Sequence, residues 1–384
     1  MVSHRTVRSK VFLMRILTFL CLALFGSLAT PFAIAQKTAA PAPESLTAEI
    51  RQGVKVMDTW YRPAKGYWEN AAGNSNWWWQ SANALTALIR FDKVTGSKEH
   101  LPYIKTAFEK NQRGNFLNEF YDDEGWWALA WVEAYELTNN PRYLRMAEII
   151  FADMTKGWSE DFGGGIWWKK DHLTKHAIEN NLFILLGLRL HAHRPNAKVA
   201  GKTYRQWAEA TWAWYEQTGF IEADFRVADA LKPDGSMHRV YFTYNQGVTL
   251  ACAVEFYQLT QDEKFLRLAE KLADAALEKM TDEKTGVLRE WLEPNSTQDL
   301  AQFKGIFMRH LYTLYTVTRK PAYGQFILKN AAAIRKNKDP QTGRYGVSWF
   351  LPYKETAYDF QAHSSALDCL AAAAGVEKLS ATQP

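Results

Sequence analysis

Cysteine is scarce in this sequence. Its 384 residues include three cysteines: Cys21 lies in an N-terminal apolar run, and Cys252 and Cys369 lie inside apolar runs with helical spacing. A fold held together by disulfides needs several cysteines, so the class of small disulfide-rich extracellular domains is excluded. We expect Cys252 and Cys369 to be buried thiols, and nothing in the pattern supports a disulfide between them.

Strand patterns are also nearly absent. From Glu44 onward, apolar residues recur with the period of a helix rather than alternating as in a strand. Helices with one charged face usually lie outside a fold, and helices that are apolar on most sides are buried. Predicted helices of the first kind cover 45–61, 99–112, 141–156, 202–217, 262–280 and 321–337. Those of the second kind cover 77–94, 124–137, 176–192, 244–259, 302–317 and 361–376.

The two kinds of helix alternate, and the pairs repeat. Three buried helices share the register of Ala84-Leu-Thr-Ala-Leu88, Ala128-Leu-Ala-Trp-Val132 and Leu250-Ala-Cys-Ala-Val254, and each leads through a short polar turn to a charged helix. Repeated helix pairs form a solenoid or a closed ring. Because the last helix is apolar rather than polar like a terminal cap, we predict closure. The predicted fold is all-α, an (α/α)6 barrel with six inner and six outer helices over residues 45–378; a right-handed open superhelix is the alternative.

Acidic residues are absent from the N-terminal segment. Its basic residues precede a mostly apolar run over 16–29, and Ala33-Ile-Ala35 follows as a small-x-small pattern. This order is typical of a cleaved signal peptide. We expect residues 1–35 to be removed, 36–44 to form a disordered leader, and the mature protein to be secreted or periplasmic without a stable membrane anchor. An uncleaved anchor is the alternative, and N-terminal sequencing of the exported protein distinguishes the two.

The remainder of the chain has almost no net charge. The whole sequence carries 46 basic and 41 acidic residues, and subtracting the four basic residues of the N-terminal segment leaves 42 against 41. A nucleic-acid-binding protein usually carries a strong basic excess. We therefore expect no nucleic-acid partner.

Metal-binding and nucleotide-binding patterns are missing too. His191 and His193 are two residues apart and cannot share a helix face, and no carboxylate nearby completes a ligand set. Gly163-Gly-Gly165 lacks the strand before it and the helix after it that a phosphate-binding loop needs. We predict no metal and no cofactor, and expect a chelator to leave activity unchanged.

Two adjacent carboxylates are the most informative feature that the chain does contain. Asp122 and Asp123 follow Tyr121 and come just before an apolar helical run. They fit a common structural role, because acids cap helices and favour the helix dipole. They also fit a chemical role, because neighbouring carboxylates push their pKa values apart and so supply one acid and one anion. Retaining glycoside hydrolysis uses such a pair about 5–5.5 Å apart.

The position of the pair favours the chemical role. It falls in one of five long connections that lead from an outer to an inner helix: 112–123, 157–175, 218–243, 281–301 and 338–360. These connections emerge at one end of the predicted ring, and long loops on one face of a rigid scaffold usually build the site. Aromatic side chains near the pair and in the next loop offer surfaces on which a sugar can stack: Tyr121, Trp126, Trp127, Trp167 and Trp168. Since neighbours on a helix diverge by about 100°, we expect only one of Trp126 and Trp127 to face the cleft.

The segment Tyr121-Asp-Asp-Glu-Gly-Trp-Trp-Ala-Leu-Ala130 resembles the paired-aspartate motif of glycoside hydrolase family 76. That family contains bacterial endo-α-1,6-mannanases and related fungal cell-wall transglycosidases. Further motifs resemble the family in its own order over about residues 76 to 370: Gly163-Gly-Gly-Ile-Trp-Trp168, Lys175-His-Ala-Ile-Glu-Asn180, Tyr244-Asn-Gln-Gly247, Phe303-Lys-Gly-Ile-Phe307 with Arg309, and Ser364-Ser-Ala-Leu-Asp368. At Glu124 the sequence departs from the family, where an apolar residue is common.

The resemblance implies an (α/α)6 barrel and retaining cleavage of α-1,6-linked mannose. It implies Asp122 as the nucleophile and Asp123 as the general acid/base. It also places at the cleft the first residues of the aligned inner helices: Asn180, Tyr244, Asn245, Gln246 and Lys304. The expected partner is an α-mannan polysaccharide or oligosaccharide, bound by a monomer.

Three other functions stay open at this point. A mannan transglycosidase would use the same covalent intermediate, and product analysis with acceptor sugars separates it from a hydrolase. A sugar epimerase on the same toroid would be expected to present histidines to the barrel centre. A glycan-binding protein without activity would keep the aromatic loops but would not need the paired acids.

Overall fold

The computed structural model describes residues 45–70, 78–295 and 298–381. The predicted signal peptide and leader, and Trp77 at the predicted start of a buried helix, lie outside the described residues. Those expectations about the N-terminal segment stay predictions. Of the helices described, none is long and apolar enough to cross a bilayer.

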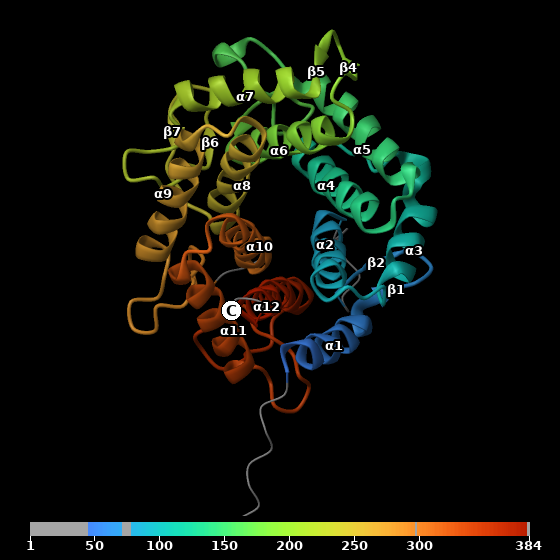
Figure 1. Cartoon of the computed structure of the whole chain (residues 1–384), viewed down its shortest axis with the longest axis vertical. Coiled ribbons are helices and arrows are strands. Elements are labelled where there is room, and N and C mark those ends of the chain that lie inside the picture. The colour runs from blue at the N-terminus through green and yellow to red at the C-terminus, as the bar shows by residue number, and fades with distance from the viewer. Residues whose placement is uncertain (1–44, 71–77, 296–297, 382–384) are drawn as a thin grey trace, which may run out of the picture. The chain divides into compact units, whose positions relative to one another are not determined.

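Six helices encircle the centre of a ring, and six others lie around them (Figure 1). The inner helices are α2 (Trp78–Thr95), α4 (Tyr121–Thr138), α6 (Ala177–His193), α8 (Thr243–Thr260), α10 (Leu300–Thr318) and α12 (Asp359–Ala381). The outer helices are α1 (Leu46–Met57), α3 (Leu101–Asn111), α5 (Pro141–Met154), α7 (Tyr204–Thr218), α9 (Glu263–Lys279) and α11 (Pro321–Asn337). Each inner helix packs on the next, and α12 packs on α2. The ring is therefore closed as an (α/α)6 barrel, and the open superhelix is excluded.

The few strands lie in the connections and are two residues long. Strand β1 (Tyr61–Arg62) pairs antiparallel with β2 (Tyr67–Trp68), and β4 (Lys198–Val199) pairs with β5 (Lys202–Thr203). In a third sheet, β6 (Ala230–Leu231) lies between β3 (Lys175–His176) and β7 (Met237–His238). This sheet joins the start of α6 to the connection before α8, and so fixes two of the loops at the end where the inner helices begin.

The inner helices approach one another closely because glycines face their neighbours. A Cβ added at Gly305 of α10 would lie 2.4 Å from the carbonyl oxygen of Ser365 in α12. A Cβ added at Gly247 of α8 would lie 2.7 Å from the Cα atom of Phe307 in α10. In both cases the obstacle is backbone, which cannot rotate away as a side chain can.

We expect Gly305→Ala to destabilise the barrel by about 1–3 kcal/mol, because α10 and α12 must move apart to admit the methyl group. Gly114→Ala is the matched control, since no atom lies within 4 Å of the added Cβ and the position has no left-handed backbone. Urea unfolding of the two variants and the wild type measures the difference. Equal stabilities for Gly305→Ala and the wild type would contradict the backbone contact.

Both cysteines in the described barrel are buried free thiols, as predicted: Cys252 in α8 and Cys369 in α12. Burial raises the pKa of each thiol well above its usual range. Neither cysteine therefore carries a reactive thiolate at neutral pH.

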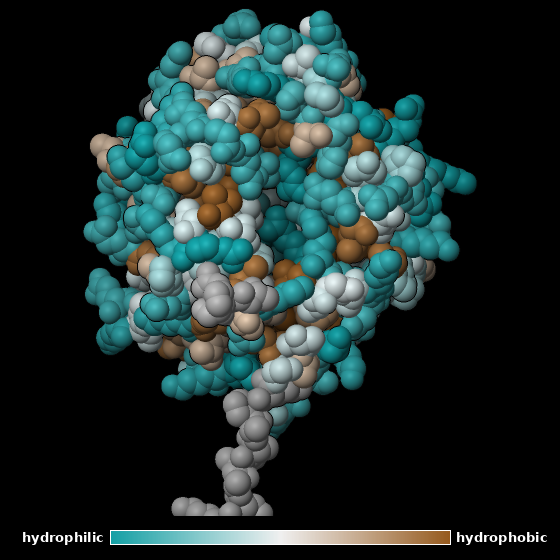
Figure 2. Space-filling model, in the orientation of Figure 1, coloured by the Kyte–Doolittle hydropathy of each residue, from teal (hydrophilic) through white to brown (hydrophobic). Residues whose placement is uncertain are grey.

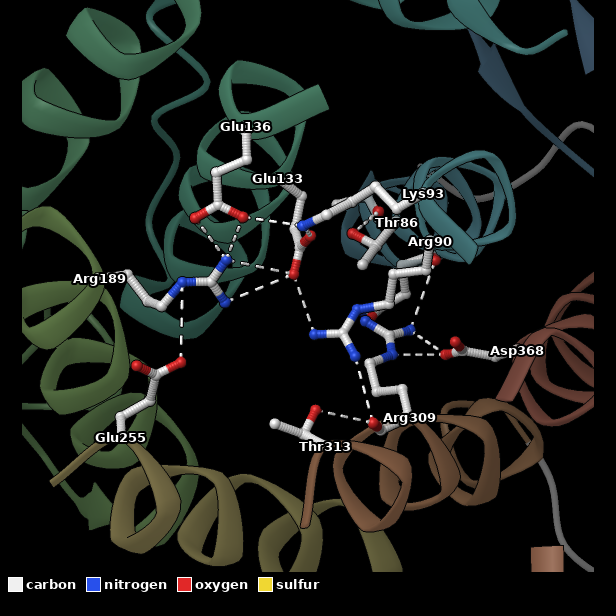
Figure 3. Close-up of polar contacts among 12 residues, drawn as sticks. Thr86, Arg90, Lys93, Glu133, Glu136, Arg189, Glu255, Arg309, Thr313 and Asp368 are labelled. Atoms are coloured by element: carbon white, nitrogen blue, oxygen red, sulfur yellow. Dashed lines mark hydrogen bonds and ion pairs between the residues drawn. The ribbon is translucent and has the colours of Figure 1, made fainter. Parts of the chain in front are cut away.

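Charged side chains from all six inner helices converge around one cavity (Figure 3). Those of α2, α4, α6 and α8 come from the C-terminal halves of their helices, and those of α10 and α12 come from nearer the middle. The sign alternates around the ring: α2 gives Arg90 and Lys93, α4 gives Glu133 and Glu136, α6 gives Arg189, α8 gives Glu255, α10 gives Arg309 and α12 gives Asp368. We call these eight residues the charged ring. It surrounds a cavity of about 400 Å³. In the view of Figure 2, hydrophilic residues line a hollow in the middle of the molecule.

Candidate active site

A second cavity, of about 280 Å³, lies at the other end of the barrel, where the inner helices begin. Helices α2, α4, α8 and α10 and three of the long connections line it. The lining residues are Trp79, Asp122, Trp126, Trp168, His176, Asp229, Phe242, Tyr244, Gln298, Asp299, Leu300 and Phe303. Three of them are carboxylates, and six are tryptophan, tyrosine or phenylalanine, a combination suited to a sugar that offers hydroxyl groups and apolar faces.

The aspartate pair is inside a helix rather than in the loop where the sequence placed it. Helix α4 begins at Tyr121, so Asp122 and Asp123 lie in its first turn. The earlier start has a tertiary cause, because the Tyr121 N–H donates to the Trp168 carbonyl at 3.0 Å. The N-cap residue is Phe120, which makes no side-chain cap, so neither aspartate occupies the capping position.

The two carboxylates have different surroundings. Asp123 Oδ2 accepts a hydrogen bond of 2.5 Å from Asn118 Nδ2, and Asn118 Oδ1 in turn accepts from the Phe120 N–H at 2.8 Å. Asp122 lines the cavity, and its Oδ1 atom has no hydrogen-bond partner among the described residues. Asp123 is thus held by Asn118, whereas Asp122 lines the cavity and has a buried Oδ1 atom without a partner among the described residues.

Burial raises the pKa of both carboxyls. For Asp122, hydrogen bonding from Trp168 and from the helix N–H groups opposes the rise. For Asp123, the charge of Asp122 adds to the rise, so its pKa lies well above the usual range. Because two neighbouring buried carboxyls repel each other when both are ionised, the pair favours one protonated and one ionised member.

Glu124 is buried behind the pair and is held by a lysine. Lys170 Nζ donates to Glu124 Oε1 and to Asp153 Oδ2, each at 2.7 Å. Burial raises the pKa of Glu124 to about 7, and the ammonium of Lys170 limits that rise. Lys170 belongs to the connection 157–175, so this contact fastens the loop to the first turn of α4.

The predicted aromatic residues divide between cavity and core. Trp126 and Trp168 line the cavity, whereas Trp127 is fully buried and packs against other rings of the core. This is the divergence expected for neighbours on a helix. Tyr121 and Trp167 are also buried, and neither lines the cavity.

The predicted polar residues are mostly buried beneath the cavity. Tyr244 lines it, with its ring stacked on Phe303 at 3.8 Å. Asn180 instead binds the backbone N–H and carbonyl of Ile166, at 2.8 and 3.1 Å. Gln246 binds three backbone groups, at 2.7–3.0 Å, and Asn245 Nδ2 donates to Asp229 Oδ1 at 3.1 Å. These amides hold the loops and do not reach the cavity themselves.

Lys304 does not lie at the cavity as the sequence suggested. Its side chain is buried, forms an ion pair with Glu293, donates to the Val347 carbonyl at 2.9 Å, and lies 4.4 Å from the centre of the Trp349 ring. The position near the start of an inner helix was read correctly. The direction of the side chain was not, because it depends on loops more than ten residues away in the sequence.

Sequence reasoning missed several residues that line the cavity, among them Trp79, His176, Asp229, Phe242, Asp299 and Phe303. Asp299 accepts a hydrogen bond from Gln80 Nε2 at 2.8 Å, and Asp229 lies 3.4 Å from His238 Nδ1. Asp299 immediately precedes α10 in a long connection, and Asp229 is in another, which resembles the context that singled out Asp122. A search for acids in the long connections would have found both.

A buried lysine organises the loop that carries Trp168. Lys175 Nζ donates to the carbonyl oxygens of Gly164, Asp161 and Ser159, at 2.6, 2.7 and 3.2 Å. It also lies 4.6 Å from the centre of the Trp167 ring. One ammonium group therefore satisfies three carbonyls of the connection 157–175, and the loop closes around it.

We expect Lys175→Met to lower the catalytic efficiency at least about tenfold, because the carbonyls left without a donor would reorganise the loop that carries Trp168. Lys156→Met is the control: this lysine immediately precedes the same connection, and its side chain is 72% exposed. Kinetics on α-1,6-mannan, the substrate that the sequence resemblance implies, and thermal melts of both variants test this. Wild-type kinetics for Lys175→Met would show that the loop keeps its shape without the ammonium.

The sequence as a whole matches one family. A model of the family described as Glycosyl hydrolase family 76 matches residues 47–383. The chain belongs to this family. The roles that the sequence resemblance gives to Asp122 and Asp123 in this family-76 chain stay predictions. Among the described residues of this family-76 chain, no group of three or more His, Cys, Asp or Glu side chains is arranged to hold a metal ion. The expected indifference to chelators stays a prediction.

Solved structures of family-76 proteins have the same fold. The chain is 25% identical to the α-1,6-mannanase GH76A of Salegentibacter sp. HEL1_6, with a TM-score of 0.77 over 86% of this chain and 100% of that one. It is 24% identical, with a TM-score of 0.77 and the same coverage, to an inactive variant of that enzyme in complex with α-1,6-mannotriose.

Curated relatives match over part of their length. The mannan endo-1,6-alpha-mannosidase DFG5 of Candida albicans is 27% identical over 53% of this chain and 50% of its own. A putative mannan endo-1,6-alpha-mannosidase of Schizosaccharomyces pombe is 24% identical over 64% of this chain and 59% of its own. The chain thus spans about half to three fifths of the length of these two relatives.

Proposed function

We propose that this protein is a glycoside hydrolase that cleaves α-1,6-linked mannan with retention of configuration, with Asp122 as nucleophile and Asp123 as general acid/base. The observation that carries the proposal is the pair of buried carboxyls in the first turn of α4, of which Asp123 is held by Asn118 and Asp122 lines an aromatic cavity. The structurally similar GH76A of Salegentibacter supports the proposal, because its variant with two consecutive aspartates changed to asparagine is inactive.

The proposed reaction has two steps. Asp122 attacks the anomeric carbon of the mannose unit in the cavity, while Asp123 gives its proton to the glycosidic oxygen and the leaving chain departs. Asp123, now ionised, then takes a proton from water, and the water oxygen attacks the anomeric carbon and releases Asp122. The difference between the two pKa values supplies the acid and the anion that the first step needs.

The cavity supplies the means to bind the sugar. Trp126, Trp168 and Tyr244 give flat apolar surfaces for the faces of mannose rings. Asp229 and Asp299 are additional acceptors for hydroxyl groups. The dipoles of the inner helices, whose N-termini lie at this end, favour the negative charge of these acids.

The linkage and the stereochemistry are tested together. Hydrolysis assays on α-1,6-, α-1,2- and α-1,3-linked mannans should show activity on the first, and proton NMR of the first product formed should show the α-anomer. Activity confined to another linkage, or a β-anomer as the first product, would contradict the proposal. Assays with added acceptor sugars separate hydrolysis from transglycosylation, the alternative that uses the same glycosyl-enzyme.

We expect a bell-shaped pH dependence of kcat/KM with its maximum near neutral pH rather than at pH 4–5. Activity should rise with pH as Asp122 loses its proton and fall as Asp123 loses its own, because kcat/KM requires one ionised and one protonated carboxyl. Burial raises the pKa of both carboxyls, so both the rising and the falling side of the profile shift to higher pH. A profile already flat at pH 4 would show that the nucleophile keeps an ordinary pKa.

A further inference from the structure

A third cavity, of about 260 Å³, lies at the same end of the barrel as the catalytic cavity. Arg226 and Tyr241 from the connection before α8 line one part of it. Residues 279–281 at the end of α9 and residues 289–292 from the connection before α10 line the rest. These two connections also provide Asp229, Phe242 and Asp299 to the catalytic cavity. The two cavities therefore share their loops.

A continuous run of aromatic rings joins the two cavities. Tyr244 stacks on Phe303 at 3.8 Å, Phe303 contacts Phe242 at 5.6 Å, and Phe242 contacts Trp291 at 5.9 Å. The first three rings line the catalytic cavity, and Trp291 lines the third one. Trp291 is 48% exposed, so about half of its surface is open to solvent, which is unusual for a tryptophan in this barrel.

The third cavity is rich in cations. Arg226, Lys279 and Arg289 line it. Arg226 and Lys279 share one carboxylate, Asp224, at 2.8 and 3.3 Å. A second carboxylate, Glu222, pairs with Arg239 and accepts from the Tyr241 hydroxyl at 2.7 Å. Arg289 Nη2 donates to the Glu293 carbonyl at 2.9 Å, and among the described residues Arg289 forms no ion pair.

The cations are also held in place. Asp224 orients both Arg226 and Lys279, and the Arg226 guanidinium lies 3.9 Å from the centre of the Tyr241 ring. Glu290, which also lines the cavity, accepts hydrogen bonds from the Thr243 N–H and hydroxyl, and burial raises its pKa to about 8. At neutral pH Glu290 therefore adds little negative charge to offset the cations.

We propose that this cavity is a distal subsite that binds a negatively charged substituent on the glycan chain, with Trp291 stacking on the sugar that carries it. Planar guanidinium groups bind phosphate and carboxylate through paired N–H donors, and an ammonium adds charge. The substrate class is then an α-1,6-mannan bearing anionic groups, such as phosphate esters or the carboxylate of a uronic acid at the non-reducing end or on a branch. The inference rests on the proposed function for the identity of the glycan, but the anion site can be tested by binding alone.

The test compares three oligosaccharides of equal length: a neutral α-1,6-mannotetraose, one with a phosphate monoester on its non-reducing terminal residue, and one in which a carboxylate replaces the hydroxymethyl group of that same residue, whose C6 is not part of a linkage. We expect the wild type to prefer a charged substrate over the neutral one by at least about tenfold in kcat/KM. The preference should shrink as salt is raised, because these side chains are partly exposed. Whether the phosphate or the carboxylate is preferred identifies the anion.

The variants are Lys279→Gln combined with Arg289→Gln, and Lys271→Gln combined with Lys284→Gln as the control. Both pairs remove the same net charge, and neither control residue lines the cavity. The first pair should reduce the ratio of charged to neutral kcat/KM at least fivefold, and the control pair should leave it within about twofold of the wild type. Equal rates on charged and neutral substrates, or equal effects of the two pairs, would overturn the subsite.

Binding measured by titration calorimetry separates the two proposals. If no oligosaccharide is hydrolysed, the proposed function fails, and the subsite is still judged by whether the charged oligosaccharides bind more tightly than the neutral one. If all three are hydrolysed but bind equally, the function stands and the subsite fails.

Discussion

Asp122→Asn should abolish hydrolysis of α-1,6-mannan and leave the barrel folded. Without the carboxylate no glycosyl-enzyme forms, and loss of a nucleophile typically costs at least about 10⁴-fold in kcat. Asparagine has nearly the same shape, and the Asp122 Oδ1 atom has no hydrogen-bond partner that the change would disrupt. Thermal melts together with assays on mannan measure both effects.

The activity that Asp123→Asn loses should depend on the leaving group of the substrate. General acid/base help is worth about 10²–10⁴-fold, so activity on mannan should fall by that amount. An aryl mannoside with an activated leaving group needs little protonation, so formation of the glycosyl-enzyme should be partly spared. The comparison distinguishes an acid from a nucleophile, because a nucleophile is required for both substrates.

If the two acids only support the start of α4, both variants should stay folded and fully active, because asparagine is tolerated at a helix start as well as aspartate. Full activity in both would remove the main support for an enzyme. Asp171→Asn provides a matched control. This exposed aspartate is in the connection 157–175 and lines neither the cavity that contains Asp122 nor the third cavity.

Glu133→Gln should destabilise the barrel by about 3–5 kcal/mol, because it leaves buried cations without their partner. Glu133 of α4 lies between Arg90 and Lys93 of α2 and Arg189 of α6, and its side chain is 5% exposed (Figure 3). Glu209→Gln removes an exposed contact with Arg205 instead and should cost no more than about 0.5 kcal/mol. Chemical unfolding of both variants at neutral pH measures the contrast.

The same contact makes the barrel sensitive to acid. The cations around Glu133 hold its pKa well below the usual range, and those around Glu136 lower its pKa to about 2. Because the folded pKa is depressed, the stabilisation is fully present above the unfolded pKa of about 4.5 and is lost as pH falls toward the folded pKa. The stability gap between wild type and Glu133→Gln should therefore narrow below about pH 4.5. A gap that stays constant down to pH 2.5 would show that Glu133 acts through packing rather than charge.

The sequence by itself determined the helices and their two classes. Apolar spacing is a local property, so the inner and outer helices could be located within a few residues and their repetition indicated a closed ring. The aspartate pair could be found for a similar reason, because two carboxylates among aromatic residues at a helix start form a local pattern. The three-residue error at the start of α4 came from a distant partner, the Trp168 carbonyl that accepts from Tyr121.

Only the tertiary structure decided which side chains meet. Lys304 turned toward Glu293 and Val347 rather than toward the catalytic cavity, because the loops that surround it belong to other parts of the chain. Asp229 and Asp299 reach that cavity from two separate connections, and the charged ring exists only because closure brings six helices together. Periodicity in a sequence tells which face of a helix is buried, but the contacts of a buried polar group depend on neighbours that the chain supplies from far away. The position of the aspartate pair could therefore be predicted from the sequence, whereas the cavity around the pair depends on the closure of the ring.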